Sequence, residues 1–121
     1  MTREMLPVAW MQRVCTRSVP DVLALYDENA VLIPTYDKSD LPGAGTGVLV
    51  GKYNIAGYFQ RFLAKPSLCG TVDSIIVQQL SGVKIYSGLY TFRWHGGTAR
   101  ARYTFVVTTS GKSTHHSSQA P

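Results

Sequence analysis

The stretch Ala99-Arg100-Ala101-Arg102-Tyr103-Thr104-Phe105-Val106-Val107 decides the fold class. It alternates and is rich in aromatic and β-branched residues, a pattern that predicts a β-strand. Because side chains alternate along a strand, Arg100 and Arg102 share one face, and Tyr103 and Phe105 share the other. Two arginines inside a strand need water, a ligand or a carboxylate beside them. The segment 115–121 (His-His-Ser-Ser-Gln-Ala-Pro) places imidazoles and hydroxyls on the next strand, which predicts a polar cavity or a functional interface here.

Two longer strand patterns precede this stretch, at 71–80 and 83–94, and a short one follows it at 114–118. The predicted strand of the opening stretch runs over 99–108. Glycine-containing turns at 81–82 and 95–97 separate the three long strands, which predicts antiparallel pairing of neighbours in the sequence.

The first half of the chain predicts three helices and one buried strand. A first helix is expected over about 5–16, and a second begins at the capping residue Ser18 and ends at 27–29. A strand over 30–35 is stopped by proline, 36–50 reads as a loop, and 53–64 has the apolar stripe of an amphipathic helix. This order predicts one α+β domain over 1–121, in which a curved antiparallel sheet and N-terminal helices enclose a cone-shaped pocket.

Composition narrows the class of protein further. Of 121 residues, 45% are hydrophobic and 16% charged, which is typical of a globular chain. The twelve Lys and Arg residues exceed the seven Asp and Glu residues but are scattered, which favours a small anion over nucleic acid as partner.

No apolar run is long enough to cross a membrane, so we expect no membrane partner. Cys15 and Cys69 lie far apart, and we expect reduced thiols in a cytoplasmic protein.

The predicted order of elements resembles the nuclear transport factor 2-like fold nearly from end to end. More narrowly, four pieces resemble the iota-class carbonic anhydrase family, itself similar to the association domain of calcium/calmodulin-dependent kinase II. These pieces are Leu25-Tyr26 to Leu32-Ile33-Pro34-Thr35, Tyr58-Phe59-Gln60-Arg61-Phe62-Leu63, Ser87-Gly88-Leu89-Tyr90-Thr91-Phe92, and Ala101-Arg102-Tyr103-Thr104-Phe105-Val106 with His115-His116-Ser117-Ser118.

The resemblance implies a lyase that hydrates CO2 to bicarbonate in a hydroxyl-lined cone, in some members without a metal. Carried over to this chain, it assigns catalytic roles to Thr35, Tyr58 and one serine of the His-His-Ser-Ser motif. Ser117 and Ser118 both remain candidates, because neighbours on a strand point to opposite faces.

The same resemblance implies a second group of residues that contact the ligand. Arg102 is expected to stabilise the anion, Tyr90 belongs to the third matching piece, and His115 or His116 is expected to accept a proton near neutral pH. The chain's histidines do not have the spacing of a zinc site, so we expect neither a metal nor another cofactor.

A different function remains open. The His-x-Ser-x-x-Pro pattern at His116, Ser118 and Pro121 also resembles the kinase association domain, which implies a non-catalytic oligomerisation module with a pocket for small carboxylates. Four aromatic residues on one strand face form an interface in this interpretation and pack on the helices in the other: Tyr86, Tyr90, Phe92 and Trp94. Both functions predict a homodimer or a higher homo-oligomer. An isomerase or dehydratase ranks lower, because Asp73 is the only acid in the later strands.

Overall fold

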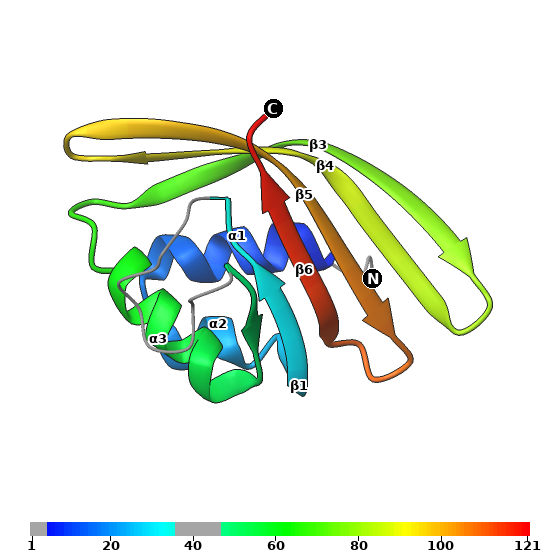
Figure 1. Ribbon diagram of the computed structural model, residues 1–121. Coiled ribbons are helices and arrows are strands. Elements are labelled where there is room, and N and C mark those ends of the chain that lie inside the picture. The colour runs from blue at the N-terminus through cyan, green and yellow to red at the C-terminus, as the bar shows by residue number, and fades with distance from the viewer. Residues whose placement is uncertain (1–4, 36–46) are drawn as a thin grey trace.

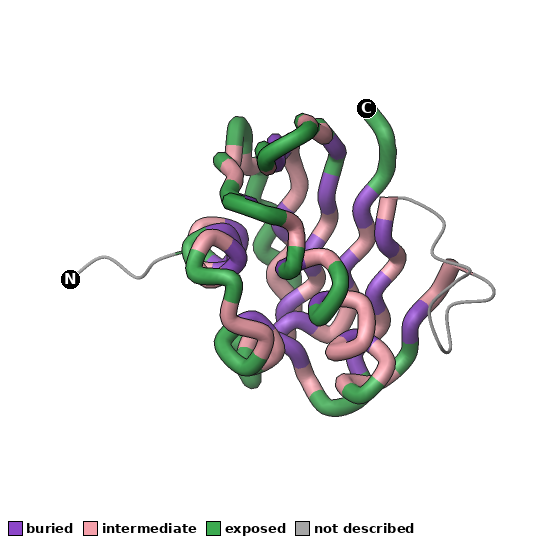
Figure 2. Tube along the Cα trace, turned by 90° about the vertical axis from the view of Figure 1, so that its left-hand side faces the viewer, coloured by how far each residue is buried: buried purple, intermediate pink, exposed green. Residues whose placement is uncertain are grey.

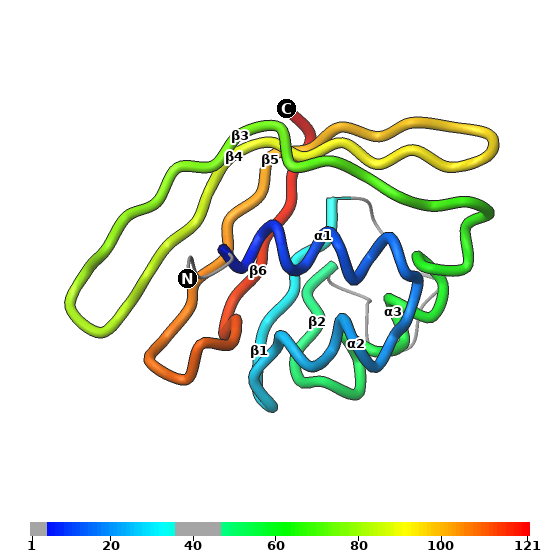
Figure 3. Tube along the Cα trace, turned by 180° about the vertical axis from the view of Figure 1, so that it is seen from behind, coloured from blue at the N-terminus to red at the C-terminus, as the bar shows by residue number. Residues whose placement is uncertain are grey.

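The computed structural model describes residues 5–35 and 47–121. In chain order the elements are α1 (Leu6–Thr16), α2 (Val19–Leu23), β1 (Tyr26–Ile33), β2 (Leu49–Val50), α3 (Lys52–Phe62), β3 (Cys69–Leu80), β4 (Val83–Trp94), β5 (Gly97–Thr108) and β6 (Ser113–Gln119). The six strands form one sheet in the order β2-β1-β6-β5-β4-β3. The helices lie on one face of this sheet, which arches over them (Figures 1 and 3). None of the described helices has the length and apolar character needed to cross a bilayer.

The α+β architecture expected from the sequence is confirmed. β3, β4, β5 and β6 pair antiparallel in sequence order. The turns between the long strands contain Gly82 at φ 73° and Gly96 at φ 111°, a backbone conformation that favours glycine. The parallel pairing of β1 with β6, which joins the first strand to the last, was not predicted.

The largest differences from the predicted boundaries concern the second helix and the first strand. The second helix ends at Leu23, and β1 begins at Tyr26 rather than at residue 30. Tyr26 pairs with Ser113 of β6 and is fully buried, so strand pairing overrides the helical spacing. Of the expected loop over 36–50, residues 36–46 lie outside the described residues, and Leu49–Val50 form β2 against β1.

The inner face of the sheet and the helices share an aromatic core. Burial alternates along the second half of β5 as the period of two requires, and Figure 2 shows buried residues gathered where the sheet faces the helices. Tyr86, Tyr90, Phe92 and Trp94 all belong to this inner layer. The alternative in which these aromatics pack on the helices is therefore confirmed, and their assignment to an oligomer interface is wrong.

The expectation of two reduced thiols is also wrong. Cys15 at the end of α1 and Cys69 at the start of β3 form a disulfide. The next residue, Gly70, allows the close packing of β3 on α1: a Cβ there would lie 2.9 Å from Met11 Sδ and 2.5 Å from the Thr91 carbonyl oxygen. The Gly70 N–H donates a hydrogen bond to Cys15 Sγ at 3.2 Å. Helix α1 is thus held against the edge strand by a covalent bond and by backbone contact.

We predict that removing this disulfide destabilises the protein. The bond closes a loop with a sequence separation of 54, which in the loop-entropy treatment corresponds to about 4 kcal/mol of unfolding free energy. Urea unfolding of a Cys15→Ala/Cys69→Ala variant, compared with oxidised wild type, measures the loss. Addition of a dithiol should lower the midpoint of the wild type and leave that of the variant unchanged. Equal midpoints for oxidised wild type and variant would contradict the prediction.

Candidate functional site

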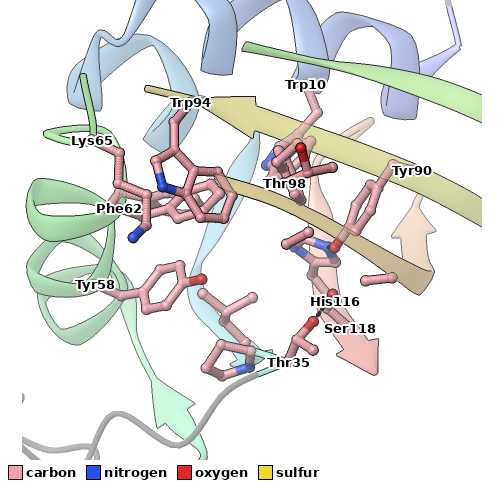
Figure 4. Close-up of a pocket in the computed structure, with 16 residues that line it drawn as sticks. Trp10, Thr35, Tyr58, Phe62, Lys65, Tyr90, Trp94, Thr98, His116 and Ser118 are labelled. Atoms are coloured by element: carbon pink, nitrogen blue, oxygen red, sulfur yellow. Dashed lines mark hydrogen bonds between the residues drawn. The ribbon is translucent and has the colours of Figure 1, made fainter. Parts of the chain in front are cut away.

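A cavity of about 280 Å³ lies between the inner face of the sheet and helices α1 and α3. Most of its wall is aromatic. The aromatic residues that line it are Trp10, Tyr58, Phe59, Phe62, Tyr90, Phe92 and Trp94. Figure 4 shows Thr35, His116 and Ser118 close together on one side of the space, with Lys65 and Trp94 on the opposite side. The site is therefore an apolar cavity with a polar floor, a design typical of small-molecule sites.

Two hydroxyl groups meet at the floor of the cavity. Thr35 Oγ1 and Ser118 Oγ lie 2.5 Å apart, in hydrogen-bond contact. Thr35 follows Pro34, the residue after the end of β1, and Ser118 lies on β6. Because β1 and β6 run parallel, with Ile33 opposite Ser117, residues separated by 83 positions in the sequence meet at one end of the sheet.

Pairing with β5 decides which residues of β6 face the cavity. His116 pairs with Phe105, a fully buried residue of the inner face. His116 and Ser118 therefore point inward and line the cavity. Ser117 and His115 take the outer face and do not line it, which settles the choice between the two serines in favour of Ser118 as the cavity residue.

His116 is held between two tyrosine hydroxyls. Its Nδ1 lies 2.7 Å from Tyr26 Oη and its Nε2 lies 3.2 Å from Tyr90 Oη. Its ring stacks on Phe105 with centroids 3.9 Å apart, and only 2% of its surface is exposed. Burial, with a smaller effect of His115, lowers the pKa of His116 to about 3. His116 is thus a neutral imidazole at physiological pH, and the expectation that it accepts a proton near neutrality is wrong.

Tyr58 and Tyr90, both candidates from the sequence, line the cavity. Tyr58 projects from α3 into the space, across from Thr35 and Ser118 (Figure 4). Tyr90 comes from β4, its hydroxyl lies 3.2 Å from His116 Nε2, and burial raises the pKa of its phenol above the ordinary value. The Tyr90 phenol therefore remains protonated and carries an O–H group.

The sequence-based prediction missed the cation of this site. Lys65 lines the cavity, and its Nζ lies 4.7 Å from the centre of the Trp94 ring. The sequence did contain a pattern that could have indicated Lys65. Tyr58, Phe62 and Lys65 are spaced four and three residues apart, so they share one side of α3 and its continuation.

Arg102, expected to stabilise a bound anion, lies elsewhere. It is exposed on β5, next to buried Ala101 and Tyr103, and does not line the cavity. Since side chains alternate along a strand, Arg102 faces the outer side of the sheet, so this expectation is wrong.

Asp73 also lies outside the cavity and accepts hydrogen bonds from Thr71 and Thr91. Within residues 5–35 and 47–121, no three His, Cys, Asp or Glu side chains are grouped to hold a metal ion.

Neither a protein-family model nor a curated protein sequence matches this chain. Solved structures do. A protein from Xanthomonas campestris assigned as a calcium/calmodulin-dependent protein kinase II association domain is 29% identical, with a TM-score of 0.79 over 96% of this chain and 83% of that one. An NTF2-like protein of unknown function from Pseudomonas putida is 16% identical, with a TM-score of 0.78 over 96% and 82% of the two chains.

A Mycobacterium tuberculosis protein in complex with estradiol-17β-hemisuccinate has the same architecture. It is 18% identical, with a TM-score of 0.71 over 93% of this chain and 88% of that one. The curved sheet, the three helices on one face and the enclosed cavity define the class of nuclear transport factor 2-like folds. The chain has this fold, and an association-domain-like protein is among its structural neighbours.

We predict that His116 makes the stability of the protein pH-dependent. The unfolded chain binds a proton at this histidine below about pH 6.5, whereas the folded chain binds it only near pH 3. The free energy of unfolding should therefore fall as the pH is lowered from 6.5 toward 3, by up to about 1.4 kcal/mol per pH unit from this group.

Urea unfolding at a series of pH values measures this slope. A His116→Gln variant should show a shallower slope, whereas Ser117→Ala, on the outer face, should keep the slope of the wild type. Equal slopes for wild type and His116→Gln would contradict the role assigned to this buried imidazole.

Proposed function

We propose that the cavity hydrates CO2 reversibly to bicarbonate at the Thr35–Ser118 hydroxyl pair. One observation carries the proposal: Thr35, Tyr58 and Ser118, which come from three separate pieces of the sequence that resemble the iota-class carbonic anhydrases, all line one cavity. The hydroxyl groups at the floor suit the oxygens of bicarbonate, and the aromatic wall suits apolar CO2.

CO2 hydration requires a positioned water and groups that stabilise the developing negative charge. A water oxygen forms a bond to the carbon of CO2, and the electron pair of one C–O π bond moves onto its oxygen, which becomes a carboxylate oxygen. One proton of the water leaves to solvent or buffer. Hydroxyl donors at the floor stabilise the negative charge that develops on oxygen, and a fixed position for the water lowers the entropic cost of the reaction. Neutral His116 does not accept the proton; its Nε2 lies 3.2 Å from the hydroxyl of Tyr90, which also lines the cavity.

We predict that Thr35→Val and Ser118→Ala each lower kcat/KM for CO2 hydration by about tenfold or more, because each removes a hydroxyl from the site of the developing charge. Stopped-flow hydration with a pH indicator, with and without a metal chelator, measures the effect. Thr35→Ser keeps the hydroxyl and should retain activity. Ser117→Ala should behave as wild type, since Ser117 lies on the outer face.

Three outcomes would contradict the proposal. The first is a folded wild-type protein without hydration activity. The second is equal activity in all four variants. The third is activity that disappears on chelation, which would assign the chemistry to a metal ion instead of the hydroxyl pair.

A specific observation favours a second function, the non-catalytic binding of a small carboxylate. The cavity volume of about 280 Å³ is much larger than CO2 and one water require, since a water occupies about 30 Å³ in the liquid. Lys65 supplies a positive charge beside Trp94. In this second proposal the aromatic wall holds an apolar body, Lys65 or the hydroxyl floor holds the carboxylate, and the chain assembles into a homo-oligomer like an association domain.

For this second function we predict that Lys65→Met weakens benzoate binding about three- to tenfold, through loss of a half-exposed charge partner. Lys65→Arg keeps the charge and should keep most of the affinity. Isothermal titration calorimetry measures both, and sedimentation equilibrium of the same samples tests for a homodimer or larger oligomer. Unchanged affinity in Lys65→Met would place the carboxylate away from the lysine, and a monomer would contradict the assembly part.

A cytoplasmic location remains a prediction. It rested on reduced thiols, and the Cys15–Cys69 disulfide weakens it, because such bonds persist mainly in oxidising compartments. Thiol labelling of the protein in fresh cell extract decides the point, since labelled cysteines would support the cytoplasm and a protected pair would oppose it.

A further inference from the structure

We infer that the Cys15–Cys69 disulfide is a thiol-exchange site, attacked at Cys69 by a small thiol that also carries a negative charge. In this step Cys15 leaves as a thiolate, and Arg93 attracts the attacking thiol. The inference concerns a covalent modification of the chain and is independent of the proposed function. It goes beyond the stabilising effect of the bond, because it names the sulfur that reacts and the kind of reagent.

The two cysteines differ in exposure. Cys69 is exposed at the start of β3, whereas Cys15 is half-buried in the last turn of α1. β3 lies at the edge of the six-stranded sheet, so solvent reaches its outer side. A thiolate attacks one sulfur of a disulfide and expels the other, and access helps to decide which sulfur is attacked. Exposure therefore favours attack at Cys69.

Cys15 has the surroundings of the leaving sulfur. The Gly70 N–H donates a hydrogen bond to Cys15 Sγ at 3.2 Å, and this bond strengthens when the sulfur gains a full negative charge. The C-terminal end of α1 has the opposite effect, because its partial negative charge disfavours a thiolate. The hydrogen bond outweighs it, since a hydrogen bond to a charged group contributes more than an exposed helix end.

A cation lies beside the exposed sulfur. Arg93 of β4 is the cross-strand partner of Cys69, and such partners have Cβ atoms about 5 Å apart. Arg93 is exposed, and its guanidinium donates to Thr71 Oγ1 at 3.5 Å, two residues beyond Cys69 on β3. Asp73 accepts a hydrogen bond from the same hydroxyl and offsets part of the positive charge. Arg93 is therefore placed to attract an anionic thiol toward Cys69.

The exchange step balances without an oxidant. The thiolate RS⁻ forms an S–S bond with Cys69 Sγ, the bond between Cys15 and Cys69 breaks, and its electron pair stays on Cys15 Sγ. The new thiolate takes up a proton from solvent, which replaces the proton that the attacking thiol released. The product is a mixed disulfide at Cys69. Helix α1, which carries Trp10 of the cavity wall, then has no covalent link to β3.

The first test identifies the sulfur that is attacked. The oxidised whole chain is mixed with 3-mercaptopropionate in buffer without denaturant, quenched early with acid and alkylated with N-ethylmaleimide. Peptide mass spectrometry should find mercaptopropionate on Cys69 and N-ethylmaleimide on Cys15. The open groove between α1 and β3 is also lined by Cys15, which makes attack at this residue the alternative. An adduct mainly on Cys15 would overturn the inference.

The second test measures the role of Arg93. Exchange rates are compared for 3-mercaptopropionate, which is anionic, and 2-mercaptoethanol, which is neutral and of similar size. Arg93→Gln should slow the anionic thiol about threefold and leave the neutral thiol unchanged, because attraction between exposed charges is modest. Arg93→Lys should keep the wild-type rates. Each variant is compared with wild type using the same thiol, so the different acidities of the two thiols cancel.

Arg102→Gln is the matched control on the outer face. Arg102 lies four residues along β5 from Thr98, the β5 partner of Arg93, which corresponds to about 13 Å. This exceeds the screening length of about 10 Å at 0.1 M salt. Both thiols should therefore react with Arg102→Gln at the wild-type rates.

Salt gives a measurement that needs no variant. Raising the salt from about 0.05 M to about 0.5 M should slow the anionic thiol and leave the neutral thiol unchanged. Arg93→Gln with no effect, or with an equal effect on both thiols, would overturn the role of the arginine, because a merely structural role does not distinguish their charges. Exchange that proceeds only at the rate of global unfolding would overturn the whole inference.

Discussion

The hydrogen bonding of His116 between Tyr26 and Tyr90 is the interaction on which the rest of the structure depends. A buried imidazole is costly unless both ring nitrogens have partners, and here each nitrogen meets a tyrosine hydroxyl. The partners come from β1 and β4, and Trp10 of α1 completes the set. One set of hydrogen bonds therefore connects β6, β1, β4 and α1 beside the cavity floor.

The cavity combines three chemical environments. Its floor is polar and uncharged, its wall is aromatic, and its positive charge sits on Lys65 beside Trp94. An oxygen-rich acid satisfies the first and third, and an apolar body or CO2 satisfies the second. The disulfide at Cys15 joins α1, which carries Trp10, to the edge strand, and so fixes one wall of the cavity relative to the sheet.

Much of the fold was readable from the sequence, because strand alternation and glycine turns are local signals. The prediction of β4 over 83–94 matches the observed strand, and Ser18 caps α2 by accepting a hydrogen bond from the Asp21 N–H as expected. The start of β1 at Tyr26 was not readable, because it depends on pairing with β6, which lies almost ninety positions away.

The candidate site was predicted in part. The resemblance named Thr35, Tyr58, Tyr90, Ser118 and His116, and the cavity brings all five together. The alternation of side chains grouped His116 with Ser118, but it does not say which of the two faces of a strand points inward. The inward face of β6 became known only from its register with β5. Arg102 was misplaced for the same reason. The charge state of His116 depends on burial, which no local pattern reports.

The most direct test of the account is a high-resolution crystal structure of the protein soaked with bicarbonate. The account predicts the anion at the cavity floor, with its oxygens within hydrogen-bond distance of the Thr35 and Ser118 hydroxyls. A floor that holds no anion, with bicarbonate bound instead to the exposed arginines Arg100 and Arg102 of the outer face, would contradict it.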